Sequence, residues 1–354
     1  MSTDNNTEAA PELEAALEHL QPSVDNKDTE MKNAKIEYVG IDCGFGAVKV
    51  CAGDKFGINK LYKFPSAIAP VTANEHFNDN RAIIMDGKSY YIGEDALGVE
   101  SDSIYELIEY KHLEAFSPLI MHKIFRDLGC DASNQPKQIV LGLSIAHIDQ
   151  SGHYKSAIQS YLNAIGFGET KLKILPQGAG VKVAYDKYAE TFPNPPQDFN
   201  SSSNFLIADI GFNTLDGLYV MGGKVNPSNV RGIENKGLVV VAAKLNELLS
   251  TAYNREYGTK ELQKIMDEGF IKIRGKRFDL TEELLSMKRA YLSLVEECLE
   301  AEFGKILDKV DYILLSGGGA YYFKDVVASD PFFRATANKS EFYNAIGYYE
   351  NSCK

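Results

Sequence analysis

Two short stretches of the sequence carry the same residue types for binding a phosphate and a metal ion. The first is DCGFG at residues 42–46, and the second is DIGFN at residues 209–213. Glycine lets the backbone turn sharply and bring its amide hydrogens close to an anion. An aspartate at the end of a strand can hold a hydrated divalent cation, whose charge offsets that of phosphates. Two such turns are able to bind one polyphosphate from both sides.

Each stretch lies between runs of alternating apolar and polar residues, which predict two β-hairpins. Residues 36–42 and 47–52 flank the first turn, and residues 205–209 and 215–221 flank the second. Asp42 and Asp209 lie 167 positions apart, and each is followed seven residues later by a charged residue, Lys49 or Asp216. One Asp-x-Gly sequence alone is more often a simple tight turn. Two copies in the same phase indicate two related domains that each open with a hairpin.

A third glycine cluster follows a predicted buried strand at residues 311–315. Gly317, Gly318 and Gly319 come directly after it, and residues 320–327 have a helical pattern. Such an arrangement brings free amides and the positive end of a helix dipole to a phosphate or ribose. The cluster is neither a Walker A loop nor a Rossmann fingerprint. Glycines at such a position also often serve only helix packing.

Composition sets the broad class of the protein. A chain of 354 residues with 44% apolar and 24% charged residues is ordinary for a soluble globular protein of about two domains. No apolar run approaches the roughly 20 residues of a membrane span, and no signal peptide is evident. We therefore expect a cytoplasmic protein. Its five cysteines are scattered, which predicts reduced thiols and no metal cluster.

The net charge of −12 is unevenly distributed. Residues 1–34 contain eight Asp and Glu against two Lys, so they carry −6 of that total. We expect this acidic segment to be a disordered tail. An alternative is a short amphipathic helical turn that presents Leu13, Leu17 and Leu20 to a partner. No broad basic face is evident, so direct nucleic acid binding is disfavoured.

The two hairpins and the triple glycine resemble the phosphate and adenosine motifs of the superfamily of actin, sugar kinases and heat-shock chaperone ATPases. Within it, the chain looks most similar to the bacterial plasmid-segregation actins (ParM/StbA family) and to related archaeal actin-like proteins. The supporting segments are residues 63–70, 91–96, 141–144, 175–180 and 332–348. The resemblance spans about residues 36–350 and leaves out the acidic tail. It implies an α/β actin-like ATPase fold, with ribonuclease H-like duplicated domains around a nucleotide cleft.

The same resemblance implies a domain organisation. Domain I would cover residues 35–170 and be rejoined by residues 336–354. Domain II would cover residues 171–335, with an inserted subdomain at about 252–285 that contains a helix at 261–266 and a small hairpin at 271–278. The Pro- and Ser-rich residues 192–204 would form a loop within domain II.

The resemblance also implies roles for individual residues. Asp42 and Asp209 would hold Mg2+ mostly through water, and Asp209 would also help to order the attacking water. Gln177 would place that water against the terminal phosphate, since this hydrolysis needs positioning more than a strong base. Plasmid actins carry glutamate there and eukaryotic actins carry glutamine, which leaves the rate open. Pro176 suits the first turn of a helix that continues through Lys182 and Tyr185.

The nucleotide contacts expected from the resemblance come from the two hairpins, the triple glycine and a helix starting near residue 237. They are Asp42, Gly44, Phe45, Gly46, Lys49, Gly211, Phe212, Asn213, Thr214, Glu234, Lys236, Gly237, Gly317, Gly318 and Gly319. Two of these expectations have alternatives. Lys49 would otherwise be a solvated lysine on a strand, and Glu234 and Lys236 would otherwise only cap the helix. Asp216 is expected to support its turn and not to take part in the chemistry.

The function implied is an ATPase that forms a head-to-tail filament with ATP (or GTP) and Mg2+. Its partners would be further copies of itself and an adaptor protein that links the filament to plasmid or other DNA, with no membrane contact. The alternative is a monomeric phosphotransferase or chaperone-like ATPase of the same superfamily, for which Gln177 would be a poor base. A nucleotide-binding scaffold without hydrolysis is a third hypothesis.

Overall fold

The computed structural model describes most of the chain in two compact units. The described residues are 35–71, 81–99, 104–106, 109–188, 203–323, 330, 332–336 and 339–354. The first unit comprises Met1–Ser201 and Ala337–Lys354, and the second comprises Ser202–Thr336. The expected acidic tail and nearly all of the expected 192–204 loop lie outside the described residues.

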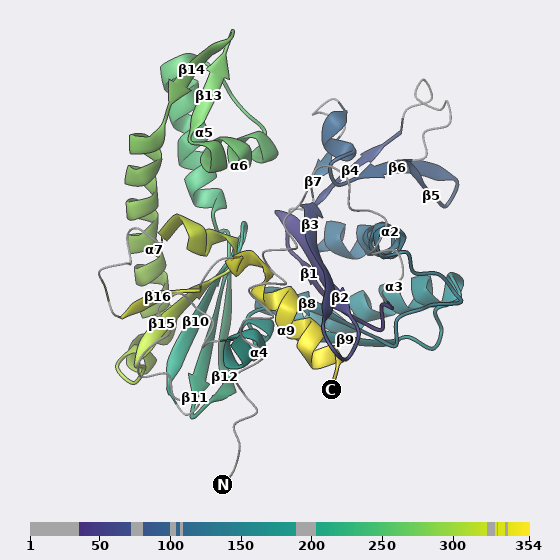
Figure 1. The fold of residues 1–354 in the computed structure, drawn as a ribbon. Coiled ribbons are helices and arrows are strands. Elements are labelled where there is room, and N and C mark those ends of the chain that lie inside the picture. Colours follow the sequence, from purple (N-terminus) through teal and green to yellow (C-terminus); the bar gives the residue numbers. More distant parts are fainter. Residues whose placement is uncertain are drawn as a thin grey trace. The chain divides into compact units, whose positions relative to one another are not determined.

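The first unit is built on a five-stranded sheet of order β3-β2-β1-β8-β9 (Figure 1). The strands are β1 (Tyr38–Cys43), β2 (Ala47–Gly53), β3 (Ile58–Pro65), β8 (Gln138–Leu143) and β9 (Lys171–Pro176). β1 pairs antiparallel with β2 and parallel with β8, and β8 pairs parallel with β9. The central strand β1 is almost wholly buried, because helices cover both faces of this sheet.

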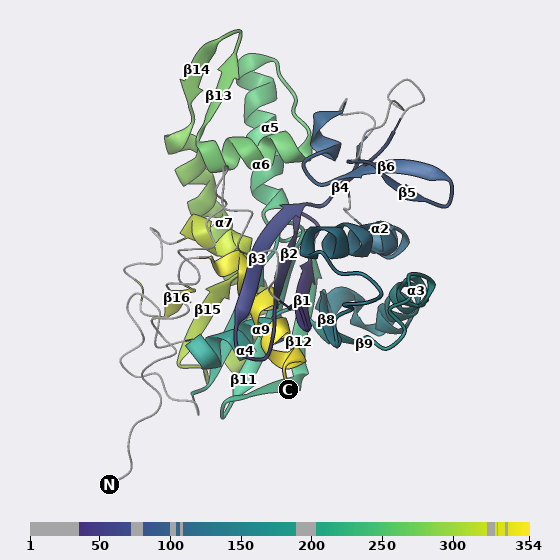
Figure 2. The same cartoon turned by 45° about the vertical axis from the view of Figure 1, so that its right-hand side comes forward.

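Helices α2 (Tyr110–Leu128) and α3 (Ser151–Ala164) cover one face, and their apolar side chains share a core with β1, β2 and β8 (Figure 2). Helices α4 (Ala179–Tyr188) and α9 (Tyr343–Ser352) pack together, and α9 lies against β1, β2 and β8. The approach of α9 is close enough that a Cβ atom on Gly40 would lie 2.1 Å from the Ala345 carbonyl oxygen. The C-terminal helix is therefore an integral part of the first unit.

A smaller sheet of order β5-β6-β4-β7 completes the first unit. Its strands are β4 (Ala67–Pro70), β5 (Ile83–Met85), β6 (Lys88–Ile92) and β7 (Tyr105–Glu106), and the 3-10 turns of this unit are η3 (Ala96–Gly98), η5 (Ile145–Gln150) and η8 (Ser340–Phe342).

The second unit repeats the topology of the first. Its sheet has the order β12-β11-β10-β15-β16, with strands β10 (Phe205–Ile210), β11 (Thr214–Met221), β12 (Lys224–Glu234), β15 (Tyr312–Ser316) and β16 (Phe333–Ala335). As in the first unit, the central strand pairs antiparallel with the next strand and parallel with a later one. Both predicted hairpins, the predicted strand before the triple glycine and the internal duplication are confirmed.

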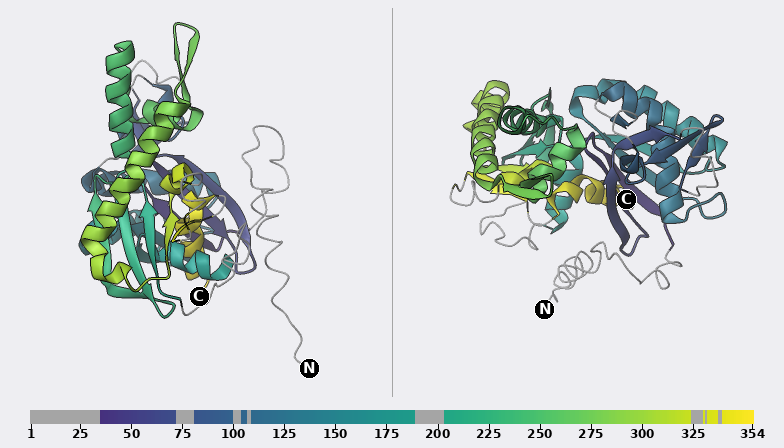
Figure 3. Two further views of the ribbon diagram at one scale, coloured as in Figure 1. Left: turned by 90° about the vertical axis from the view of Figure 1, so that its left-hand side faces the viewer. Right: turned by 90° about the horizontal axis from the view of Figure 1, so that it is seen from above.

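Helix α7 (Thr281–Leu307) runs along this sheet, as the left-hand view of Figure 3 shows. The other elements of the second unit are α5 (Val239–Tyr253), α6 (Thr259–Glu268), β13 (Phe270–Ile273), β14 (Lys276–Asp279) and the 3-10 segment η7 (Gly318–Phe323). α6 and the β13–β14 hairpin confirm the helix and the small hairpin predicted within residues 252–285. Their apolar residues join the same core as α5, α7 and the sheet.

Three details differ from the sequence-based expectations. Residues 171–201 fall in the first unit instead of the second domain, because β9 pairs with β8 and α4 packs against α9. The prediction that Pro176 begins a helix is wrong, since Pro176 is the last residue of β9 and α4 begins at Ala179. The chain after the triple glycine forms a 3-10 segment and not an α-helix up to Phe323, while residues 324–327 lie outside the described part.

No helix in the described part of the chain is both long enough and apolar enough to cross a bilayer. All five cysteines are free thiols, and Cys43 on β1 and Cys51 on β2 are buried. Burial raises the pKa of the Cys43 thiol to about 12, so this thiol is protonated at neutral pH.

Candidate functional site

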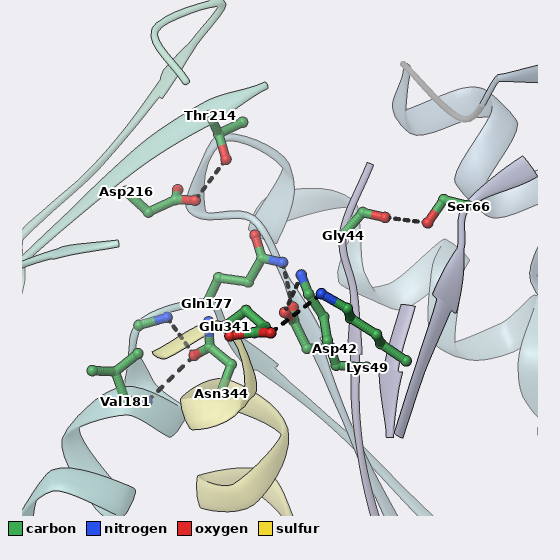
Figure 4. A network of polar contacts seen from close by, with 12 residues as sticks. Asp42, Gly44, Lys49, Ser66, Gln177, Val181, Thr214, Asp216, Glu341 and Asn344 are labelled. Atoms are coloured by element: carbon green, nitrogen blue, oxygen red, sulfur yellow. Dashed lines mark hydrogen bonds and ion pairs between the residues drawn. The ribbon is translucent and has the colours of Figure 1, made fainter. Parts of the chain in front are cut away.

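The first half-site is a three-residue polar cluster at the carboxyl end of β1. Asp42 is only 3% exposed, and each of its carboxylate oxygens accepts a hydrogen bond. Gln177 Nε2 donates to Asp42 Oδ1 over 2.7 Å, and Lys49 Nζ donates to Oδ2 over 3.0 Å (Figure 4). Lys49 lies directly opposite Asp42 in the hairpin register. The ion pair with Lys49 offsets the charge of Asp42 and rules out a freely solvated lysine at this position.

The glycine loop beside this cluster is held by Ser66, which lies between β3 and β4. Ser66 Oγ donates to the Gly44 carbonyl over 2.6 Å, and the Ser66 amide donates to the Gly46 carbonyl over 3.3 Å. The ring of Phe45 meets His147 edge-on at a centroid distance of 6.4 Å. Ser66 thus binds carbonyl groups of this loop, whose amides were predicted to bind a phosphate. Ser66 was not predicted from the sequence, because no local pattern links it to residues 44–46.

Gln177 is placed by the C-terminal helix. The Gln177 amide extends the β8–β9 pairing by donating to the Leu143 carbonyl over 2.8 Å. The chain then turns at Gly178, which has a left-handed φ of +83°. Asn344 Oδ1 on α9 accepts from the Gly178 amide at 2.9 Å and from the Val181 amide at 3.3 Å. Asn344 therefore caps the start of α4 from another helix and fixes the turn that carries Gln177.

Replacing Asn344 with alanine is expected to destabilise this turn and to slow any reaction that depends on Gln177. Two amides at the start of α4 would lose their acceptor in a buried place, so we expect a loss of about 1–3 kcal/mol in the free energy of unfolding. Urea denaturation followed by circular dichroism measures this loss. Asn351→Ala on the same helix is the matched control, because within the described part of the chain the Asn351 side chain only accepts an exposed hydrogen bond from Lys173. Equal stability of the two variants would contradict the capping role of Asn344.

The second half-site repeats the first but reverses one charge. Asp209 is the last residue but one of β10 and lies directly opposite Asp216 on β11 and Ser316 on β15. Asp216 stands where the first hairpin has Lys49, so two carboxylates replace the ion pair. Asp209 is 6% exposed and Asp216 is 1% exposed. Thr214 Oγ1 donates to Asp216 Oδ2 over 3.0 Å (Figure 4), which agrees with the expectation that Asp216 supports its turn.

The loop of residues 211–213 is bonded to the start of α5. The amides of Gly237, Leu238 and Val239 donate to the carbonyls of Asn213, Gly211 and Phe212, over 3.2, 3.1 and 2.7 Å respectively. The structure thereby brings Gly237 and the second glycine loop together. Glu234 ends β12 opposite Thr214 and is exposed, and the Lys236 carbonyl accepts a 2.5 Å hydrogen bond from Tyr291. Contacts of Glu234 and Lys236 with a nucleotide stay a prediction.

The triple glycine packs tightly against the end of β10. Gly317 has a left-handed φ of +81°, and a Cβ atom there would lie 2.5 Å from Asp209 Oδ1 and 2.6 Å from the Ile210 carbonyl oxygen. A Cβ atom on Gly319 would meet the Ile210 side chain at 2.2 Å. Packing thus accounts for Gly317 and Gly319, and it brings the segment to Asp209.

Gly317→Ala is expected to disturb the structure far more than the same substitution at Gly275, another glycine with a left-handed backbone conformation. Gly275 in the β13–β14 turn has the same φ of +81° but no atom within 4 Å of its added Cβ. Gly275→Ala should therefore cost only the backbone strain, about 1 kcal/mol, whereas Gly317→Ala must also displace Asp209. Melting temperature and nucleotide affinity measure the difference. Similar values for the two variants would contradict the close approach of Gly317 to Asp209.

Two buried hydroxyls at the same edge of the sheet were also missed. Ser316 Oγ and Thr336 Oγ1 have no hydrogen-bond partner among the described residues, although both side chains are almost completely buried. Ser316 ends β15 directly opposite Asp209, and Thr336 follows β16, the next strand of the sheet, where its amide donates to the Leu315 carbonyl. A buried hydroxyl without a partner is costly, so water or a bound ligand at this edge would satisfy both groups. The sequence alone does not predict that these two hydroxyls lie at the same edge, because this depends on the strand order.

The donor atoms of the two half-sites suit Mg2+ in different ways. Mg2+ is usually bound by one or two carboxylates together with water and phosphate oxygens. Asp209 and Asp216 supply two adjacent carboxylates, so the second half-site fits direct or water-mediated binding. The oxygens of Asp42 already accept from Gln177 and Lys49, so Asp42 fits a contact through water. No group of three or more His, Cys, Asp or Glu side chains gathers as a metal site within the described residues.

Comparisons with known proteins agree with this fold. A family model for the N-terminal domain of actin-like proteins matches residues 40–180, and one for the C-terminal part of archaeal MreB-like actin homologues matches residues 207–329. The two matches fall on the two hairpin-containing halves. The chain therefore belongs to the actin-like proteins and has the actin-like ATPase fold. No curated protein sequence matches the chain significantly.

Solved structures of similar fold include filament-forming actins. A 15-stranded ParM filament from Clostridium botulinum has a TM-score of 0.69 and 19% identity, with 90% of this chain and 99% of that chain covered. An archaeal actin homologue in complex with ADP has a TM-score of 0.65 and 17% identity, covering 88% and 98%. Bacillus thuringiensis ParM with ATP has a TM-score of 0.56 and 14% identity, covering 90% and 98%. At these identities the likeness concerns the fold.

Proposed function

We propose that the protein is a nucleotide-dependent, filament-forming ATPase in which both half-sites bind the same nucleotide. The observation that most strongly supports this proposal is the repeated Asp-Gly hairpin, which lies at the same place in two sheets of corresponding strand order. Each Asp lies at the carboxyl end of a central strand, the edge where open α/β sheets bind ligands. The relatives with ADP or ATP bound support a nucleotide as that ligand.

Lys49 and the loop amides of residues 44–46 would bind phosphate oxygens, while Asp42 keeps Lys49 in place. The loop amides of residues 211–214 would bind the same phosphates from the second hairpin. Asp209 would hold Mg2+, which offsets phosphate charge when bound, and Asp42 would contact it through water. Asp216 would help Asp209 to hold the ion, a role beyond the support of its turn that the sequence predicted. Lys49 of the first hairpin would therefore bind phosphate, and the carboxylates of the second would bind the metal ion. These roles follow from the charge reversal between the hairpins, because a lysine suits an anion and two carboxylates suit a cation.

Gln177 would position the attacking water. Its Nε2 donates to Asp42, and Figure 4 shows its carbonyl oxygen turned away from that bond, where it can accept from a water molecule. An amide does not take a proton, which suits hydrolysis through positioning and disfavours activation of a substrate hydroxyl by this residue. That chemistry favours an ATPase over the alternative of a phosphotransferase.

Filament formation is proposed from the fold relatives, two of which are filament structures. Head-to-tail contacts that do not close into a ring produce an open filament. We further propose that the filament moves plasmid or other DNA through an adaptor protein, since the sequence offers no broad basic face for DNA itself.

Phosphate release measured against protein concentration tests this proposal. With ATP and Mg2+, a polymerising ATPase should show little release below a critical concentration and a linear rise above it. Removing Mg2+ with a chelator should abolish the release. A rate strictly proportional to protein concentration from the lowest value would identify a monomeric ATPase, and no release would identify a scaffold.

A further inference from the structure

The tip of the β13–β14 hairpin carries a dense cluster of exposed positive charge. Four cationic residues lie within the six positions 272–277, and all four are exposed: Lys272, Arg274, Lys276 and Arg277. In Figure 1 this hairpin projects from the second unit at the end remote from the β10–β12 strands. Its charge contrasts with the net −12 of the whole chain.

Two features of the hairpin are unfavourable for its own stability. Arg274 has a left-handed φ of +48° in a turn position where asparagine or glycine is preferred. Lys272 lies directly opposite Arg277 in the strand register, and like charges in such a pair repel. A sequence chosen only for the hairpin's own stability would avoid both features. The cationic tip is therefore best explained by an anionic partner.

The hairpin itself does not supply that partner. Among the described residues, no ion pair involves any of the four cations. The guanidinium of Arg277 stacks on the Phe270 ring at 3.8 Å, which fixes its position without neutralising it. The only carboxylate of the hairpin is Asp279, at the base of β14, where it accepts from the Thr281 amide over 2.9 Å. The tip is left with a positive field.

We propose that the acidic segment of residues 1–34 docks on the β13–β14 tip of the same chain. This segment carries eight Asp and Glu against two Lys, so its net −6 complements the four cations. An extended chain of 34 residues reaches up to about 110 Å, several times the radius of gyration of about 20 Å expected for a globular protein of this length. Attachment to the same chain gives the segment an effective concentration near the millimolar range, which favours weak electrostatic contacts.

Nucleic acid is the competing anionic partner, and the hairpin fits it less well. Four charges on one narrow tip match a short acidic peptide, whereas tight duplex binding uses about 6–10 phosphate contacts spread over a surface. Every copy of the chain that has the hairpin also has the acidic segment, whose negative charge would repel a phosphate backbone. The proposal does not depend on nucleotide binding or hydrolysis, so it can fail while the proposed ATPase stands.

Carbodiimide cross-linking of the full-length protein, followed by peptide mass spectrometry, tests the docking. The reagent joins carboxylates to lysines in contact, so Lys272 and Lys276 report on the tip. We expect both to be linked to acidic residues within 1–34 in dilute, nucleotide-free protein. The yield should fall at least about fivefold in 0.5 M NaCl, where the Debye length is only a few ångström. It should fall as much in the variant Arg274→Glu/Arg277→Glu, which keeps both reporter lysines.

The matched control is Lys244→Glu/Lys305→Glu, which makes the same charge change at exposed positions on α5 and α7. Its cross-links to Lys272 and Lys276 should stay at the wild-type level. Absence of links to residues 1–34, or links that persist in the arginine variant, would overturn the proposal. A mixture of 14N- and 15N-labelled protein should give only unmixed pairs, and mixed pairs would overturn docking within one chain. Protection of the two lysines by duplex DNA but not by the acidic segment would assign the tip to nucleic acid.

Discussion

Asp209→Asn is expected to lower phosphate release from ATP by at least about 100-fold, the effect of removing one preorganised charge at a reacting phosphate. Asparagine keeps the shape of the side chain, so the contact with Gly317 is preserved. The substitution removes one of two opposed carboxylates, and we expect the melting temperature without nucleotide to be no lower than that of the wild type. Steady-state phosphate release and a thermal melt measure the two effects.

Asp279→Asn is the control for Asp209→Asn, because Asp279 is an exposed aspartate of the same unit, on the β13–β14 hairpin. It should leave phosphate release within about twofold of the wild type. Full activity of Asp209→Asn would show that the second hairpin does not hold the metal. A large drop in its melting temperature would instead make Asp209 a structural residue.

Gln177→Ala is expected to slow phosphate release by about 100-fold while leaving nucleotide affinity within about threefold. The reason is that Gln177 would place the attacking water and not bind the nucleotide, and a misplaced reactant typically loses a factor of this size. Filaments of the variant should therefore form with ATP and last longer than those of the wild type. Single-turnover hydrolysis, nucleotide titration and light-scattering decay measure the three quantities.

Gln159→Ala on α3 is the matched control for Gln177→Ala, because Gln159 uses its side-chain amide only toward Asn163 on the helix surface. It should behave as the wild type in all three assays. Loss of nucleotide affinity parallel to the loss of hydrolysis in Gln177→Ala would mean that Gln177 is a binding residue. Unchanged hydrolysis would remove it from the reaction.

Local patterns in the sequence were sufficient to predict the elements that carry both half-sites. The β1–β2 and β10–β11 hairpins follow from alternation and glycine turns, which act over a few residues. The repeat of the Asp-Gly motif then predicted the duplication, and the identical strand orders confirm it. The small β13–β14 hairpin was predicted by the same local signals.

Interactions between distant segments were not predictable in this way. Asn344 caps a turn 166 residues earlier in the chain, and Ser66 reaches back 22 residues to Gly44. No periodicity encodes such contacts. Pro176 was misassigned for the same reason, because its fixed φ suits both a helix start and a strand end, and pairing of β9 with β8 decided between them. Strand order likewise determines that Ser316 lies beside Asp209 and that Thr336 follows the strand next to β15.

The most direct test of the central claim is sedimentation of the full-length protein with different nucleotides. With Mg2+ and either ATP or a non-hydrolysable analogue, the protein should pellet above a critical concentration, and the analogue should give the more persistent pellet. With ADP or without nucleotide it should remain in the supernatant, and parallel samples with GTP would show which base is preferred. Electron microscopy of the ATP pellet should show filaments. A pellet of the same size in every sample, or no pellet in any, would contradict a nucleotide-dependent filament.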